Sequence, residues 1–239
     1  MDKPWAAFNK SLKAMVFDRM PDQEEFLETE FDSFGQLIKM MSRAVSSEEY
    51  LRVVDLIVAS FSPESAAARE GVTTDLNAAP FFHFGDLHID GDLVFYNTFV
   101  VTGDLSISGC LVDSYPESSL MVGGNLRARS VFSEGEINVG GKLSCSDVAY
   151  IYYNGALVRA ELLQARLVIE AGPRIGSPIE GEHVFAHDDY EQGHAEGVND
   201  QLRKILIPSL FNGPDCDPGH LSEKNLLKHL RAGDDVFLP

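Results

Sequence analysis

The sequence lacks paired cysteines, long apolar runs and an excess of basic residues, and each absence narrows the class of protein. Its three cysteines, Cys110, Cys145 and Cys216, form no CxxC pair and no metal-ligand spacing, so we expect free structural thiols rather than a disulfide framework. No run of about 18 apolar residues is present, and the first residues lack the apolar stretch of a signal peptide. We therefore expect a chain without a membrane span, located in the cytoplasm.

Basic residues are few relative to acidic ones. The 239 residues include 19 Lys and Arg against 37 Asp and Glu, which gives a net charge of −18, and 44% of the residues are hydrophobic. The hydrophobic content is sufficient for a globular core. The negative charge repels nucleic acid and anionic membranes and attracts cationic surfaces, so we expect a basic protein partner and no direct nucleic acid or membrane binding.

One short phrase, a Gly followed by a polar residue and then Leu, recurs through the middle of the chain and identifies an internal repeat. We attribute the glycines to corners whose backbone angles a Cβ would obstruct. The copies are Gly85-Asp86-Leu87, Gly91-Asp92-Leu93, Gly103-Asp104-Leu105, Gly124-Asn125-Leu126 and Gly141-Lys142-Leu143.

The spacing of the repeat predicts a three-sided coil. Apolar residues fall every six positions, and within each step polar and apolar residues alternate, as in Leu105-Ser106-Ile107-Ser108. This pattern therefore predicts that residues 82–175 form a parallel β-helix, or β-solenoid, of about five coils with about 18 residues each. An antiparallel β-sandwich with Gly-rich turns is the alternative. The six-residue series runs through Leu87, Leu93, Phe99, Leu105 and Leu111, resumes after three extra residues at Leu120, Leu126 and Phe132, and resumes again at Leu157, Leu163, Ile169 and Ile175.

Helical patterns flank the repeat, which makes the predicted fold mainly β with α. We expect an N-terminal helical segment over residues 1–80, the solenoid over 81–178, and an acidic loop with C-terminal helices over 179–239. The N-terminal segment includes a capping box at Ser46-x-x-Glu49 and a small helix from Ser62-Pro63 to Gly71. The C-terminal helices span about 198–211, with an interruption near Pro208, and 222–233. We expect the helices to cover the open rungs at the two ends of the solenoid.

No catalytic constellation is evident. The loop residues His183, His187, Asp188, Asp189 and His194 have the residue types of a metal site, but glycines interrupt the loop and a solvated acidic loop is the more common explanation. We therefore expect no metal. No phosphate-binding loop or Gly-x-Ser-x-Gly nucleophile motif occurs. An acyltransferase with His83 or His88 as its base remains a less favoured alternative.

Two breaks in the repeat and the acidic runs provide candidate contact residues. Three extra residues after Leu111 predict a loop over residues 113–119, and aromatic side chains gather within residues 147–155. Carboxylates also concentrate in residues 18–32 and 180–196. The candidate partner-binding residues are Asp113, Tyr115, Glu117, Tyr152, Tyr153, Asp188, Asp189 and Glu191.

The Gly-Asp-Leu and Gly-Gly-Asn/Lys-Leu words resemble those of the bactofilin, or polymer-forming cytoskeletal, β-helix domain. Bactofilins are mostly bare β-helices that polymerise end to end, whereas this chain carries helical segments on both sides of its repeat. The whole arrangement is similar to immunity proteins that neutralise DNase toxins, including effectors delivered by type VI secretion. This resemblance implies an antitoxin that blocks the active site of a basic toxin.

The sequence thus predicts a non-enzymatic inhibitor without a cofactor that is a monomer or small oligomer when free. Two alternatives remain open. One is a bactofilin-like scaffold that assembles into filaments, and the other is a β-helix acyltransferase.

Overall fold

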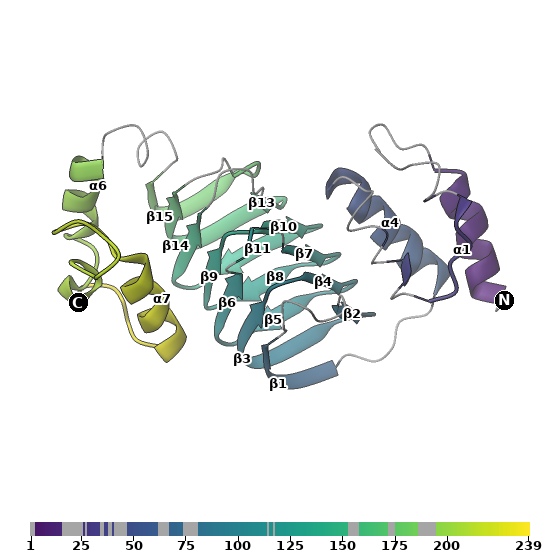
Figure 1. Ribbon diagram of the computed structural model, residues 1–239, viewed down its shortest axis with the longest axis horizontal. Helices are drawn as coiled ribbons and strands as arrows, with labels where there is room; N and C mark the ends of the chain where they lie inside the picture. Colours follow the sequence, from purple (N-terminus) through teal and green to yellow (C-terminus); the bar gives the residue numbers. More distant parts are fainter. Residues whose placement is uncertain are drawn as a thin grey trace.

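The structure is a computed structural model in which a parallel β-solenoid of about six turns carries helices along its sides (Figure 1). All neighbouring strands pair in parallel, which confirms the predicted solenoid and excludes the antiparallel sandwich. The structure describes residues 3–15, 26, 28–33, 36–37, 40, 47–61, 67–73, 81–113, 115–116, 118–152, 158–171, 175–185 and 195–239.

Each coil has three faces, and four long strands bend around one corner so that they contribute to two faces. The first, which we call the open face, comprises β5 (Leu105–Ile107), β8 (Leu126–Ala128), β11 (Lys142–Cys145) and the first halves of β1 (Ala67–Thr73), β3 (Leu87–Phe95), β14 (Leu162–Glu170) and β15 (Ile179–Phe185). The second face comprises β6 (Cys110–Asp113), β9 (Ser130–Ser133), β12 (Val148–Ile151) and the second halves of those four strands. The third face comprises β2 (Phe81–His83), β4 (Thr98–Val101), β7 (Ser119–Val122), β10 (Glu136–Val139) and β13 (Val158–Arg159).

The repeated leucines stack in register inside the coil. Leu87 pairs with Leu105, Leu105 with Leu126 and Leu126 with Leu143, and all four are buried in one apolar cluster. The six-residue step fails at Phe132, because the ladder aligns Val131 with Leu111 and turns Phe132 to the outer side. Ile169 is turned outward in the same way. Both side chains are still buried, since helices cover the outer side of this face.

The polar residue of each repeat word joins its coil to the next one. Asp86 Oδ1 accepts a hydrogen bond from the Asp104 amide (2.8 Å), and Asp104 Oδ1 accepts one from the Asn125 amide (2.7 Å). These side chains occupy the space beside the next glycine, so a Cβ added at Gly103 would lie 2.2 Å from Asp86 Oδ1. Gly85 has a φ of 103°, as expected for a corner residue, but Gly103 has no positive φ and is needed for close approach instead.

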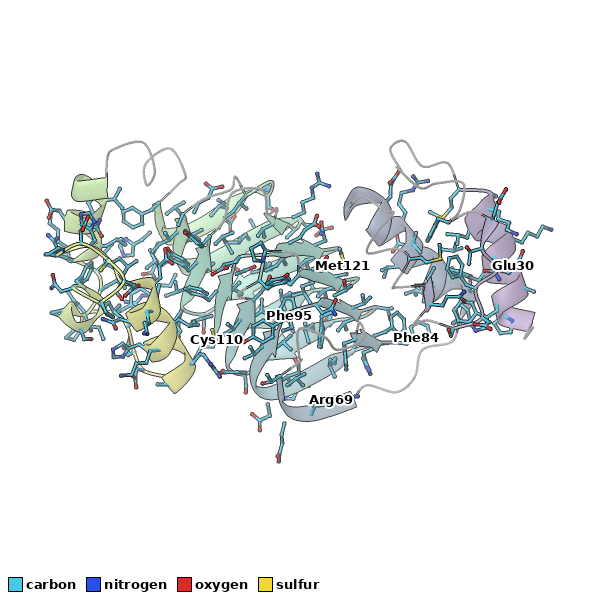
Figure 2. The ribbon with its side chains drawn as sticks, viewed as in Figure 1. Glu30, Arg69, Phe84, Phe95, Cys110 and Met121 are labelled. Atoms are coloured by element: carbon cyan, nitrogen blue, oxygen red, sulfur yellow. The ribbon has the colours of Figure 1, made fainter. Side chains whose placement is uncertain are left out.

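The N-terminal helices pack on the third face. Helix α1 (Lys3–Lys13) and helix α4 (Ser47–Ser60) share a cluster with outward side chains of three successive coils, including Val100 and Met121. Figure 2 shows Met121 and Phe84 on the side of the solenoid that faces these helices, with Phe95 inside the coil. The outer side of this face is apolar over β2, β4 and β7, where the N-terminal helices cover it, and its outer column continues with Asn138 on β10.

The C-terminal helices pack on the second face. Helix α6 (Ala195–Leu202), the 3-10 turn η1 (Pro208–Leu210) and helix α7 (Glu223–Ala232) bury Tyr150 and its neighbours in the outer columns of the face. The Tyr150 hydroxyl donates to Glu223 Oε1 (2.7 Å). Ser222 caps α7, and Gly233 ends it in the left-handed region, which confirms the boundaries predicted for this helix. The helix expected over 198–211 with an interruption near Pro208 is broken earlier: α6 ends at Leu202, and η1 begins at Pro208.

The structure corrects two further expectations. The solenoid begins at β1 rather than near residue 81 and extends through β15, so residues 67–71 form a strand where a small helix was predicted and the acidic loop begins as a strand. In addition, the described helices lie along two side faces and not over the ends, because apolar outer columns offer more surface to bury than an end rung (Figure 1). None of the described helices is long and apolar enough to cross a bilayer.

Candidate binding face

The open face is the side of the solenoid whose outer side chains remain exposed. One outward residue from each coil aligns with its neighbours in the next coil, at the strand spacing of about 4.8 Å. The column begins at Ala68 on β1 and is polar from His88 onward, with exposed side chains at His88, Arg127, Gln164 and Glu180. After Ala68, the column contains, in order, His88, Ser106, Arg127, Ser144, Gln164 and Glu180.

Hydrogen bonds between coils hold the polar side chains of this face in place. His88 Nδ1 lies 2.8 Å from Ser106 Oγ, and Ser108 Oγ donates to Asp90 Oδ1 (2.9 Å) while accepting from the Gly91 amide (2.7 Å). The ladder of Asp86 and Asp104 lies along the adjoining corner. The surface is therefore rigid before any partner arrives, which reduces the entropy lost on binding.

Charge is unevenly distributed along the open face. Its first coils are acidic, with exposed carboxylates at Glu70, Asp86 and Asp90, and Glu70 lies directly beside Asp90 in the ladder. The middle coils present Arg127 and Lys142. A depression of about 190 Å³ lies between the two regions, and its lining includes His88, Asp104 and Arg127. An acidic patch bordered by cations suits a polar, mainly cationic partner surface.

Asp113 was predicted to be a contact residue, but it lies inside the solenoid and is fully buried. Its carboxylate accepts hydrogen bonds from the Ser118 and Ser133 hydroxyls and from the Gly135 amide (3.0 Å). Burial raises the pKa of Asp113 to about 6, although these hydrogen bonds act in the opposite direction. The residue anchors the inserted loop to the next coil, and we therefore withdraw it from the binding set.

The other predicted contact residues do not form one described surface. Tyr115 is half-buried next to the Asp113 carboxylate, to which its amide donates. Tyr152 is half-buried and stacks with Tyr150 at a ring distance of 6.4 Å. Glu117, Tyr153, Asp188, Asp189 and Glu191 lie outside the described residues.

The structure describes only some of the histidines that were candidates for metal binding or catalysis. His183 lies on β15, whereas His187, Asp188, Asp189 and His194 fall outside the described residues, and the described part of the chain contains no cluster suited to a metal ion. His83 is buried, with its Nε2 2.8 Å from the Asp86 carbonyl oxygen, so it is not accessible as a base.

The open face itself was not found by sequence reasoning. Its residues alternate with core positions, as in Leu87-His88-Ile89, and this pattern shows that His88 points outward. The sequence does not show which of the three outer faces is left uncovered, because that depends on where the helices pack. No family model, curated protein or solved structure matches this chain, so it is identified by its fold alone, a parallel β-solenoid of the kind expected for a bactofilin-like β-helix.

Proposed function

We propose that this protein is an immunity, or antitoxin, protein that binds a cognate basic toxin, such as a secreted bacterial DNase, and blocks its active site. The observation that carries the proposal is that helices cover the second and third faces of a rigid solenoid, while the open face is polar, exposed and acidic over its first coils. Inhibition by steric blockade requires a stable complementary surface and no chemistry of its own.

The charge of the chain supports a cationic partner. A net charge of −18 steers a basic protein toward this one and speeds encounter by roughly 10- to 1,000-fold at low salt. A nuclease must hold a polyanionic substrate in a basic groove, so an acidic surface competes for the same groove. We assign the contact to Glu70 and Asp90 on the open face and to Asp86 at its adjoining corner.

The proposal is tested by reversing charge on this face. We expect Glu70→Lys/Asp90→Lys to slow association with the basic protein encoded by the neighbouring gene by about 10-fold or more, measured by surface plasmon resonance at several salt concentrations. Asp55→Lys on α4 is a control that reverses one charge instead of two, and Asp55 is also exposed but lies on a helix away from the open face. An unrelated basic protein measures non-specific attraction.

Three outcomes would contradict the assignment. One is the absence of any complex with the neighbouring gene product, and another is failure of this chain to rescue cells that express it. The third is a larger effect from Asp55→Lys than from the open-face pair.

Assembly into filaments is the second candidate function, and one observation favours it. Val184, on the final strand β15, is 42% exposed although it lies in the column that faces the core in earlier coils. The opposite end disfavours stacking, because the Arg69 guanidinium lies over the Phe81 ring (5.1 Å) in an inward column of the first coil (Figure 2). Sedimentation velocity distinguishes the two: the scaffold forms polymers, whereas the immunity protein remains a monomer or small oligomer.

A further inference from the structure

Three polar side chains of the C-terminal region form a hydrogen-bonded chain remote in sequence from the repeat. The His229 ring joins Ser209 on one side, with Nε2 3.3 Å from Oγ, to Asp234 on the other, with Nδ1 2.8 Å from Oδ2. A carboxylate only accepts hydrogen bonds, so it holds the Nδ1 proton on the ring and leaves the Nε2 lone pair directed at the serine hydroxyl. This is the order of groups that activates a serine nucleophile.

The backbone around these residues fixes their positions. Ser209 lies in η1, where Asn225 Nδ2 donates to the Ser209 carbonyl oxygen (3.0 Å) and ties the turn to α7. His229 lies in the last turn of α7, and the chain reverses at Gly233 with a φ of 80°. The Asp234 amide then donates to the His229 carbonyl oxygen (3.1 Å), which brings the carboxylate back beside the ring.

A second serine and histidine pair in the chain provides an internal comparison. On the open face, His88 uses Nδ1 to contact Ser106 Oγ (2.8 Å). Among the described residues, no carboxylate is hydrogen-bonded to the other nitrogen of His88, so nothing there orients the ring for proton transfer. The pair at Ser209 differs by having Asp234 in that role.

We propose that Ser209 is an activated nucleophile that is acylated by small activated esters. The Ser209 oxygen attacks the carbonyl carbon, its proton passes to His229 Nε2, and the leaving alkoxide or phenoxide receives that proton. Water then attacks the acyl-serine with His229 as base, releasing the carboxylic acid and restoring the hydroxyl. Asp234 is a positioning residue. This activity is independent of the proposed binding function, which uses the open face.

The exposure of the site determines the class of substrate. Ser209 is exposed, the Asp234 side chain is 52% exposed and that of His229 is 24% exposed. An ester can therefore approach from solvent, but the site offers little surface to bind a large group. The leaving group must consequently be good, and aryl esters are favoured over peptides.

The test uses the full-length protein and a fluorophosphonate probe, which phosphonylates activated serines, with intact mass and peptide mapping as readouts. We expect one adduct, at Ser209, that is lost in Ser209→Ala. His229→Gln lowers the labelling rate by about 100-fold or more, in line with removal of a general base. Asp234→Asn also lowers it, whereas Asp234→Glu retains most of it, which separates orientation by a carboxylate from simple packing. Turnover of a p-nitrophenyl ester is measured in parallel.

Ser106→Ala is the matched control and leaves labelling unchanged. The proposal is overturned if the wild-type protein takes up no probe, or if Ser106 is labelled as fast as Ser209. It is also overturned if His229→Gln, shown by circular dichroism to be folded, is labelled at the wild-type rate. In each of these cases the three residues only fasten the end of α7 to η1.

Discussion

At the scale of single residues, Asp113 illustrates how a polar position inside the solenoid is used. Its carboxylate is buried at the site of the three-residue insertion and gathers donors from two coils. Without it, the hydroxyls and amide that point at it would be left unpaired in the core, at a cost of about 1–3 kcal/mol for each buried group. The insertion is therefore held in the structure by an internal hydrogen-bonded cluster.

The raised pKa of Asp113 predicts how stability depends on pH. Because the folded-state pKa, about 6, exceeds the ordinary pKa of an Asp carboxyl, 3.8, the folded state holds this proton more tightly. The stability that this tighter proton binding adds is fully present below pH 3.8 and is lost as pH rises through about 6. The variant Asp113→Asn cannot ionise at this position. We expect its free energy of unfolding, relative to that of the wild type, to rise by up to about 3 kcal/mol between pH 4 and pH 7. Urea unfolding at both pH values measures this difference, and a constant difference would contradict the burial of the charge.

The cysteines provide a second prediction. Burial, with a smaller effect of Asp92, raises the pKa of the Cys110 thiol to about 12, and burial also raises the pKa of Cys145. Thiolates are the reactive species, so both should resist alkylation in the folded protein, whereas Cys216 is only half-buried. We expect iodoacetamide at pH 8 to modify Cys216 alone, and all three after denaturation, as read by mass spectrometry. Native labelling of Cys110 at its denatured rate would disprove this placement.

At the scale of elements, the corners determine how coils follow one another. A Cβ at Gly103 would lie 2.6 Å from the backbone carbonyl carbon of Gly85, closer than real contacts allow. We expect Gly103→Ala to destabilise the protein by about 1–3 kcal/mol, the usual cost of overpacking. Gly197→Ala in α6 is the control, because its Cβ meets nothing within 4 Å and should be neutral or stabilise by up to about 1 kcal/mol. Equal melting temperatures for the two variants would contradict the stacking of the corners.

The repeat words predicted the middle coils well because each word encodes a physical unit: a close-packed corner, a ladder side chain and a core leucine. The first and last strands could not be predicted in this way. β1 reads Ala-Ala-Arg-Glu-Gly-Val-Thr and β15 reads Ile-Glu-Gly-Glu-His-Val-Phe, and neither contains the word. They become strands because the adjacent coil offers an unpaired edge.

The outward position of Phe132 was missed for a related reason. A strict step of six places this residue in the core, but the coil between Leu126 and Leu143 is short, and its ladder places Val131 inside. The C-terminal helices then make a large apolar residue favourable on the outer side. The local periodicity thus determines that the chain coils, whereas segments distant in sequence determine what packs on the outer side of each face.

At the scale of the whole molecule, the arrangement has one consequence for function. Helices bury the second and third faces, so the open face is where the solenoid itself meets solvent. The sequence predicted an acidic binding protein but placed its contacts at the repeat breaks and in the late acidic loop. Which charged residues remain exposed depends on where the helices pack. Because the open face is acidic over its first coils, we place the proposed contact there.

Carboxyl footprinting of the free protein and of its complex with the basic protein encoded by the neighbouring gene tests this placement most directly. Carbodiimide labelling reports the accessibility of each Asp and Glu side chain. We expect Glu70, Asp86 and Asp90 to lose labelling in the complex, while Asp55 on α4 and Asp235 after α7 remain labelled. Unchanged labelling of the first three, with protection of Asp55 or Asp235 instead, would contradict the open face as the binding surface.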